Sequence, residues 1–152
     1  DPAMTGLRFR DATRADVPEI VALLADDSLG KGREGAATQA YLNAFDEIAA
    51  NPMHQLIVGE AGGRIIACCQ LTILSGLSRG GGRRALVEAV RVASDLRSQG
   101  IGALLMAECE VRARAAGCTI IQLTTDRSRH DAHRFYERLG YQPSHLGMKK
   151  PL

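Results

Sequence analysis

The sequence predicts an α/β domain that contains an antiparallel hairpin and a strand–helix–strand crossover. Segments with alternating apolar residues and segments with apolar residues at helical spacing follow one another along the chain. Gly62-Gly63 separates two apolar runs, which is typical of the tight turn of a hairpin. The strand expected over 85–92 is followed by a glycine-rich turn, a helical segment and another apolar run, which indicates the crossover.

Residues 4–152 contain neither an internal repeat nor a segment typical of an interdomain linker, so we expect one domain. Asp1-Pro2-Ala3 precede Met4 and are interpreted as a remnant of cloning. The 152 residues suffice to bury a core, and 45% hydrophobic residues with mixed charge favour a soluble globular protein. A net charge of +2 does not indicate nucleic-acid binding, and no apolar run approaches a membrane span.

Helices are expected where apolar residues recur every three or four positions, over 17–24, 38–50, 100–116 and 131–139. Thr13 and Asp16 resemble a capping box before the first of these helices. Strands are expected at the alternating or apolar runs over 7–10, 55–60, 64–74, 85–92 and 119–124. The segments 27–35 and 75–84 are expected to be loops, and the tail, 141–152, is expected to supply one or two last strands.

The four cysteines lie inside apolar segments and lack the spacing of a zinc site; they are Cys68, Cys69, Cys109 and Cys118. Buried, reduced thiols suit the cytoplasm. We therefore expect a cytoplasmic protein without a metal site.

The segment from Arg97 to Ala103 has the composition of a phosphate-binding turn. Gly100 and Gly102 allow the backbone to approach a ligand closely, and the first N–H groups of the following helix have no partner within the helix. Such amides lie at the positive end of the helix dipole and bind a pyrophosphate well. The P-loop lysine is absent, and Leu105 stands where the Rossmann pattern has its third glycine. The alternative is a plain glycine-rich connection between a strand and a helix.

Several segments resemble the GNAT superfamily of acetyl-CoA-dependent N-acetyltransferases. Arg97-x-x-Gly100-x-Gly102 matches that family's acyl-CoA motif, Gln/Arg-x-x-Gly-x-Gly/Ala. Residues 7–16 resemble its first strand and helix start, 87–92 its fourth strand, and 131–141 its final helix and turn. The resemblance covers nearly the whole chain. It implies the GNAT fold, a mixed and mostly antiparallel sheet of about six or seven strands with about four helices, splayed between strands four and five.

The resemblance also implies which residues bind acetyl-CoA. The amides from Ser98 to Ala103 would hold the pyrophosphate, Val90 would donate its N–H to the thioester carbonyl, and Val92 would pair with pantetheine amides. The implied set is Val90, Arg91, Val92, Arg97, Ser98, Gln99, Gly100, Ile101, Gly102, Ala103, Asp126 and Tyr136. Asp126 stands where many relatives have Asn. Ser98 replaces a common Gly, and this replacement is tolerable if φ at Ser98 is negative.

Tyr136 matches the tyrosine that protonates the departing CoA thiolate in many family members. A phenol that is neutral at pH 7 can donate this proton. The alternative is that Tyr136 only packs beside Phe135.

Glu88 is the candidate base. Strand periodicity is expected to place it on one face with Val90 and Val92, where an unpaired carboxylate would be costly to bury. There it could bind an ammonium group and accept its proton. The alternative is an edge-exposed position or a salt bridge, for which the candidate partners are Arg64, Arg83 and Arg84.

We expect direct attack of an amine on the thioester, because no cysteine lies beside an evident histidine partner. The expected acceptor is a small primary amine, an amino-bearing metabolite or a drug, and a peptide or protein amine is the second choice. A catalytically silent module that senses acyl-CoA is the alternative of a different class. Polar residues that could wall the acceptor site, or simply be solvated, are Asp26, Asp27, Glu34, Tyr41, His133 and His145. A homodimer is a further expectation, because dimers are common in the family.

Overall fold

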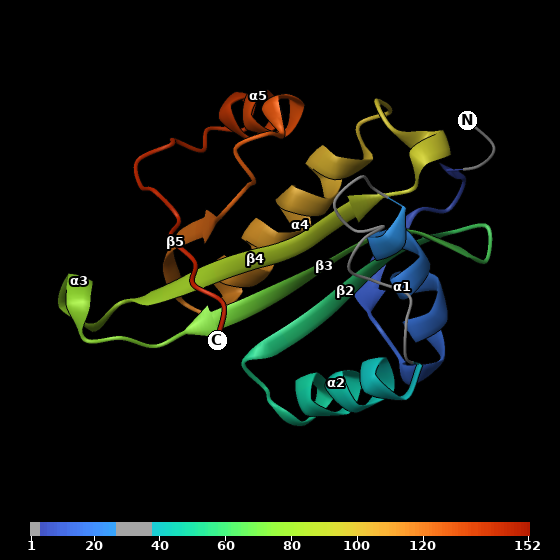
Figure 1. Ribbon diagram of the computed structural model, residues 1–152, viewed down its shortest axis with the longest axis horizontal. Helices are drawn as coiled ribbons and strands as arrows, with labels where there is room; N and C mark the ends of the chain where they lie inside the picture. The colour runs from blue at the N-terminus through green and yellow to red at the C-terminus, as the bar shows by residue number, and fades with distance from the viewer. Residues whose placement is uncertain (1–3, 27–37) are drawn as a thin grey trace.

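A mixed sheet with strand order β1-β2-β3-β4-β5 organises the molecule, as the computed structural model shows (Figure 1). The structure describes residues 4–26 and 38–152. The strands are β1 (Arg8–Asp11), β2 (His54–Ala61), β3 (Arg64–Leu74), β4 (Arg83–Val92) and β5 (Cys118–Leu123). Strands β1 to β4 pair antiparallel in sequence order, and β5 pairs parallel to β4. The β2–β3 hairpin turns at Gly62 and Gly63, which both have positive φ, as the two apolar runs around them predict.

Helices cover both faces of this sheet (Figure 1). α1 (Val17–Ala25) and α2 (Thr38–Ala50) pack on one face, and α4 (Ile101–Ala115) packs on the other as the crossover between β4 and β5. α3 (Ser78–Gly81) is a single turn between β3 and β4, and α5 (His130–Arg138) follows β5. Short 3₁₀ segments, Arg14–Asp16 and Ser94–Leu96, precede α1 and follow β4. None of the helices described combines the length and the apolarity that a membrane crossing requires.

The predicted loop over 27–35 lies outside the described residues. The other predicted elements are confirmed in type and approximate position, with two exceptions. The segment 75–84, expected to be a loop, contains α3 and the first residues of β4. The tail, 141–152, forms no strand, so the described sheet has five strands rather than six or seven, with five α-helices rather than four. Pro143 and Pro151 lack the N–H group that a strand ladder needs, and every residue from 142 to the end is exposed. The tail therefore runs along the surface without joining the sheet.

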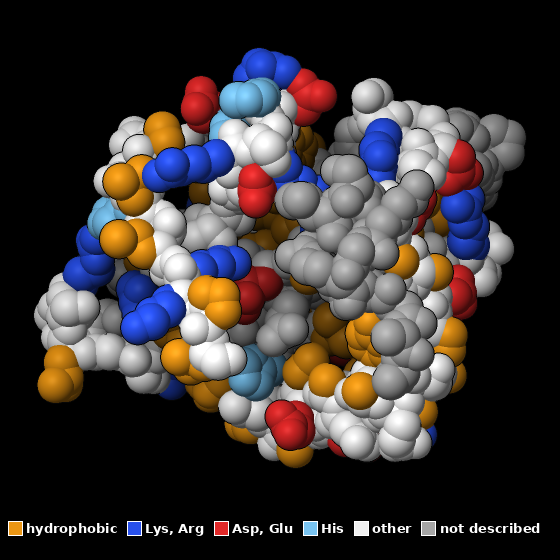
Figure 2. Space-filling model, viewed as in Figure 1, with side chains coloured by type: hydrophobic (Ala, Val, Ile, Leu, Met, Phe, Trp, Pro, Cys, Tyr) orange, Lys and Arg blue, Asp and Glu red, His pale blue; other side chains and the backbone are white. Residues whose placement is uncertain are grey.

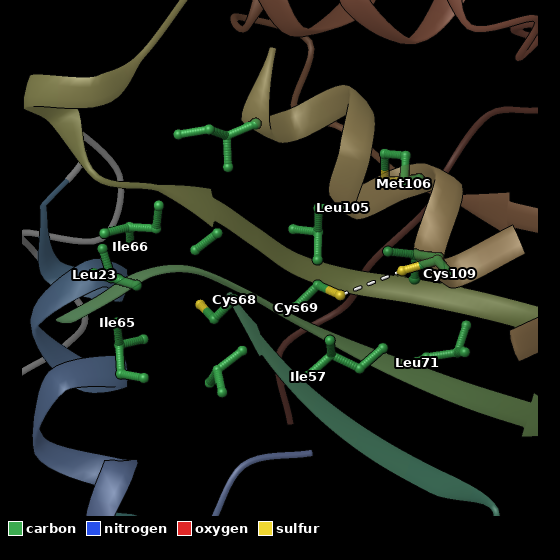
Figure 3. Close-up of a cluster of buried hydrophobic side chains, with 14 of the residues drawn as sticks. Leu23, Ile57, Ile65, Ile66, Cys68, Cys69, Leu71, Leu105, Met106 and Cys109 are labelled. Carbon is green, nitrogen blue, oxygen red and sulfur yellow. Dashed lines mark hydrogen bonds between the residues drawn. The ribbon is translucent and has the colours of Figure 1, made fainter. Parts of the chain in front are cut away.

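The core lies mainly between the sheet and α4 (Figure 3). Ile57 and Leu71 on the sheet and Leu105 and Met106 on α4 are fully buried. Ile101, Leu105 and Cys109 are all buried and lie four residues apart, the spacing that places residues of a helix on a single face. The apolar side chains of β2, β3 and β4 thus form the surface against which α4 packs.

The cysteines described are free thiols, as expected, and three of the four are buried. The Cys69 and Cys109 sulfurs lie 3.4 Å apart across the β3–α4 interface (Figure 3). Burial raises the pKa of the Cys68 thiol to about 12, so this group stays protonated at neutral pH. Cys68 therefore behaves as a small apolar core residue, and Cys69 and Cys109 pack against each other in the core.

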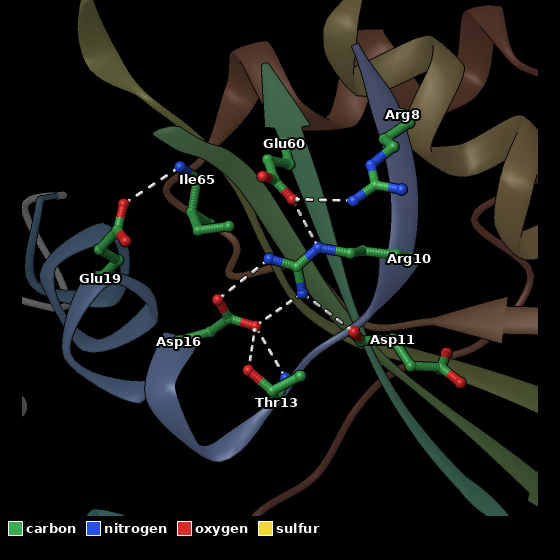
Figure 4. Close-up of polar contacts among 8 residues, drawn as sticks. All are labelled: Arg8, Arg10, Asp11, Thr13, Asp16, Glu19, Glu60 and Ile65. Atoms are coloured by element: carbon green, nitrogen blue, oxygen red, sulfur yellow. Dashed lines mark hydrogen bonds and ion pairs between the residues drawn. The ribbon is translucent and has the colours of Figure 1, made fainter. Parts of the chain in front are cut away.

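A network of charged side chains fixes the start of the chain to the sheet (Figure 4). Arg10 on β1 donates to both carboxylate oxygens of Asp16, at 2.7 and 3.1 Å, and to Glu60 on β2 at 2.6 Å. Asp16 also accepts the Thr13 N–H at 2.7 Å, which is the capping contact that the sequence predicts. The guanidinium of Arg10 and the Thr13 amide hold the pKa of Asp16 at about 2, below its ordinary value. Helix α1 is thereby locked to the first two strands.

Replacing Asp16 by Asn should lower the free energy of unfolding by about 2 kcal/mol at pH 7, which is the free-energy equivalent of its pKa depression. A depressed carboxyl pKa stabilises the fold fully above the ordinary pKa. That stabilisation is lost as the pH falls from about 4 to about 2. Urea unfolding of the wild type and D16N across this range should therefore show their stabilities converging. D46N is the matched control, because Asp46 pairs with Arg14 at the surface and should change stability by less than about 1 kcal/mol.

Candidate active site

The turn between β4 and α4 contains a row of backbone N–H groups that the helix leaves without an acceptor. The first helical hydrogen bond of α4 joins the Leu104 N–H to the Gly100 oxygen at 3.2 Å. The preceding amides of Ile101, Gly102 and Ala103 therefore have no acceptor within the helix. They stand at the positive end of the α4 dipole, where an anion is stabilised.

The path of the chain into this turn is strained. Gly100 has φ +82°, which suits glycine, but Ser98 has φ +67°. The negative φ under which a serine is readily tolerated here is therefore not present. Two left-handed residues separated by Gln99 let the extended chain at Arg97 turn into the axis of α4, and a serine in this conformation costs about 1 kcal/mol.

Neighbouring residues hold the turn from two sides. The guanidinium of Arg97 donates to the backbone oxygen of Asp26 at 3.1 Å, so it ties the turn to the end of α1. A Cβ added at Gly102 would lie 3.1 Å from the ring of Phe135 on α5. The second glycine of the motif thus allows α5 to approach α4 closely. The sequence motif alone suggests only that this glycine lets the backbone approach a ligand.

Strands β4 and β5 separate beside this turn. Their last paired residues are Val87 and Leu123, whereas β4 continues to Val92. The backbone groups of residues 88–92 that face β5 therefore have no strand partner. This is the splay implied for the fourth and fifth strands, and it places Val90 and Val92 along an open strand edge.

A β-bulge at Ala89 lies within the open part of β4. Ala89 has φ +55°, and the pairing with β3 jumps from Gln70–Glu88 to Cys68–Arg91. The Cys68 thiol donates to the Ala89 oxygen over 3.8 Å. The extra residue changes which side chains share a face.

Because of this bulge, Glu88 and Arg91 lie on the face of Gln70 and Cys68, which carries α1 and α2. Val92 pairs with Ala67 and lies on the opposite face. The expectation that Glu88, Val90 and Val92 share one face is therefore wrong for Val92. Regular alternation fails where the bulge adds a residue.

Glu88 is exposed and forms no ion pair with any residue in the described ranges. The arginines considered as its partners are engaged elsewhere. Arg64 binds Asp95 at 2.8 Å, Arg84 donates to Gln122 at 3.0 Å, and Arg83 donates to the Ala116 oxygen at 3.1 Å. The alternative of a salt bridge is thus not seen, and the carboxylate of Glu88 is open to an incoming group.

Tyr136 lies on α5 with its ring edge-on to Phe135 and Tyr141, at centroid distances of 5.0 and 5.8 Å. Burial raises the pKa of Tyr136, while Arg129 and Arg91 oppose this effect. Its hydroxyl forms no hydrogen bond with the part of the chain that the structure describes. The ring therefore packs beside Phe135, which agrees with the packing part of the alternative interpretation. The phenol is neutral and has no described hydrogen-bond partner, so it can also donate a proton.

The other polar candidates make local contacts. Asp126 accepts the N–H and the hydroxyl of Ser128 at 2.9 and 2.6 Å, and its backbone oxygen lies 2.8 Å from the imidazole of His133. These contacts shape the segment that leads into α5. His145 lies against Ser144 in the exposed tail. Asp27 and Glu34 lie outside the described residues.

Two polar residues near the splay give no signal in the sequence. Thr125 lies just past the end of β5, and its buried hydroxyl has no hydrogen-bond partner in the described structure. Gln70 lies opposite Glu88 on β3. Neither residue belongs to a motif, and only the strand pairing and the burial of the hydroxyl reveal them.

These features fit acetyl-CoA. The free amides at the start of α4 suit its pyrophosphate. The open edge of β4 and the orphaned Thr125 hydroxyl suit the amides of its pantetheine arm. Within residues 4–26 and 38–152, no group of three or more His, Cys, Asp or Glu side chains could hold a metal ion.

Comparisons with known proteins agree with this geometry. Residues 18–141 match the model of the Acetyltransferase (GNAT) family. An aminoalkylphosphonate N-acetyltransferase from Salmonella typhimurium is 30% identical over 152 residues, which cover 100% of this chain and 96% of that protein.

Two solved structures extend the comparison. A protein from Bacillus halodurans described as a transcriptional regulator is 42% identical with a TM-score of 0.92, over 96% of this chain and 99% of that one. A predicted acetyltransferase from Clostridium acetobutylicum, solved with acetyl-CoA, shares the fold at 17% identity with a TM-score of 0.74, over 94% and 96% of the two chains. The chain therefore belongs to the GNAT family of acetyltransferases, and it is an N-acetyltransferase.

Proposed function

We propose that the protein transfers the acetyl group of acetyl-CoA to the primary amine of a small molecule by direct attack. The observation that carries the proposal is the continuity of the open β4 edge, from Glu88 to Val92, with the free amides at the start of α4. One extended ligand with a peptide-like arm and a pyrophosphate can satisfy both sets of backbone groups at once.

Acetyl-CoA supplies an activated acetyl thioester when it is bound. The backbone N–H of Val90 is proposed to donate to the thioester carbonyl oxygen, where negative charge develops during attack. The carboxylate of Glu88 accepts a proton from the ammonium group of the acceptor, directly or through water. The phenol of Tyr136 donates its proton to the sulfur as the C–S bond breaks, and burial favours the protonated phenol that this step requires. The nitrogen loses its second proton as the amide forms, and that proton restores the phenol through water.

The proposed acceptor is an amine that also carries negative charge. The Salmonella relative is named for aminoalkylphosphonates, which combine an amine with an anionic phosphonate. Figure 2 shows Lys and Arg side chains gathered on the left of the view, over α3, β5 and the tail. The tail sequence contains Lys149 and Lys150. Basic groups there would attract the phosphonate while Glu88 receives the amine.

A second candidate function is an acyl-CoA-binding module without catalysis. The 42% identical protein described as a transcriptional regulator favours it, because that description names no reaction. The two candidates differ in one measurement. A catalyst releases CoA thiol from acetyl-CoA when an amine such as 2-aminoethylphosphonate is added, whereas a sensor binds acetyl-CoA and releases none.

Replacing Gly100 by Ala should raise the KM for acetyl-CoA about five- to tenfold, because an alanine at φ +82° strains the turn by about 1–2 kcal/mol. Steady-state kinetics with varied acetyl-CoA measures this change. G117A is the matched control, since Gly117 has φ +79° and, like Gly100, open space around an added Cβ. An equal change in KM in both variants would contradict a specific role of the turn at Gly100.

Replacing Tyr136 by Phe should lower kcat about 100-fold, which is the typical contribution of a general acid, and should leave the KM for acetyl-CoA nearly unchanged. Y141F is the matched control. It removes the hydroxyl of a neighbouring tyrosine whose oxygen is buried without a described hydrogen-bond partner. An unchanged kcat in Y136F would remove this residue from the acid role.

Replacing Glu88 by Gln should reduce kcat/KM most strongly at low pH, where the acceptor is an ammonium ion and needs a base. The reduction should shrink above the pKa of the acceptor amine, where the neutral amine no longer needs Glu88. A pH–rate profile of wild type and E88Q tests this, with E137Q on the exposed side of α5 as the control. A reduction that does not vary with pH would contradict the role of Glu88 as the base.

A further inference from the structure

Gln70 lies at the centre of the sheet face that carries α1 and α2. It pairs with Leu56 on β2 and with Glu88 on β4, so all three side chains share this face. Directly paired residues in antiparallel strands have Cβ atoms about 5 Å apart. The carboxamide of Gln70 is therefore next to the carboxylate that receives the acceptor amine in the proposed reaction.

The polar groups of this pair are not used inside the described structure. Gln70 is half-buried, and its carboxamide forms no hydrogen bond with any residue that the structure describes. On β3 its neighbours on the same face are Thr72, which contacts His54 at 3.1 Å, and Cys68, which contacts Ala89. The carboxamide is not among the buried unpartnered atoms, so it is accessible and free to form a hydrogen bond with a bound molecule.

We infer that Gln70 is a specificity-determining residue that binds the acceptor amine together with Glu88 and selects a primary amine. The inference rests on the proposed function, because it assigns a second contact to the same acceptor. Glu88 supplies one oxygen to the amine and the Gln70 side-chain carbonyl supplies another.

The proton balance explains the selectivity for primary amines. A primary ammonium ion has three N–H bonds. Glu88 removes one proton, and the electron pair of that N–H bond becomes the lone pair that attacks the thioester carbonyl. The Gln70 carbonyl oxygen accepts a hydrogen bond from one of the two remaining N–H groups and so fixes the direction of the lone pair. After the attack the nitrogen carries a positive charge, and it must lose a second proton to water as the C–S bond breaks and the amide forms. A primary amine can lose that proton while its other N–H stays bound to Gln70. An N-methyl amine has only one N–H left, which cannot both stay bound to Gln70 and be lost.

The test compares 2-aminoethylphosphonate with its N-methyl derivative in the wild type and in Gln70→Met. Methionine has a similar length and is apolar, so it maintains packing beside Leu56 while removing the carbonyl oxygen. We expect the wild type to favour the primary amine, and the variant to lower the ratio of the two kcat/KM values about tenfold, the effect of one hydrogen bond to a charged group. The KM for acetyl-CoA should not change.

Gln55→Met is the matched control. Gln55 lies on β2 on the opposite face and contacts Arg112 at 3.1 Å, away from Glu88. Its replacement should leave the ratio of kcat/KM values unchanged. A ratio that is unchanged in Q70M, or that falls equally in Q55M, would overturn the inference and leave the proposed function intact.

Calorimetric titration of both amines into the protein with CoA present separates binding from turnover. The inference is supported if the wild type binds the primary amine and Q70M binds it about tenfold more weakly. If this binding is seen without acetyl transfer, the proposed catalysis is contradicted and the inference about Gln70 still holds. If the wild type binds neither amine, or binds both equally, the inference is overturned.

Discussion

Ala89 adopts a left-handed backbone conformation in the middle of β4, and the bulge that it forms governs the geometry of the site. The residues before it, up to Val87, pair with β3 and β5 on both sides, whereas those after it pair with β3 alone. The Cys68 thiol stabilises the bulge by donating a hydrogen bond to the Ala89 oxygen, and the thiol stays protonated because it is buried. One strand thus serves as a core element over its first half and as an open edge over its second half.

The turn after β4, like the bulge, contains a non-glycine residue with a positive φ. Ser98 and Ala89 are two of the three non-glycine residues with positive φ in the described chain; Ala89 lies within the open strand edge and Ser98 lies in the turn that follows it. Each costs on the order of 1 kcal/mol or more, and such strain persists only where the surroundings enforce it. The surroundings here are the buried side chains of α4 and the ties of Arg97 to α1 and of Gly102 to Phe135. Strain is therefore concentrated where backbone groups must be left open.

The sequence suffices for the helices, the hairpin and the order of the elements, because these follow from apolar spacing and from glycine turns. Helix α2 begins and ends at the predicted residues, and the Thr13–Asp16 cap is confirmed. The bulge is hard to predict, because residues 85–92 are apolar apart from Glu88 and Arg91 and Ala89 carries no signal of a left-handed conformation. Strand periodicity alone places Val92 on the same face as Glu88, whereas the bulge puts these two side chains on opposite faces. The pairing of Gln70 with Glu88 also depends on strand register, which spacing within one strand does not reveal.

In the proposed reaction, the same bulge allows donor and acceptor to reach one point from different sides. The open edge of β4 offers backbone groups in the plane of the sheet, whereas Glu88 and Gln70 project from the face that carries α1 and α2. A donor that lies along the edge and an acceptor that approaches from the face can therefore meet near Val90 without competing for the same groups. Changes in face residues such as Gln70 can then alter the choice of amine while the edge and the α4 turn continue to bind the same donor. This separation is a physical reason why a family can keep one donor and differ in its acceptors.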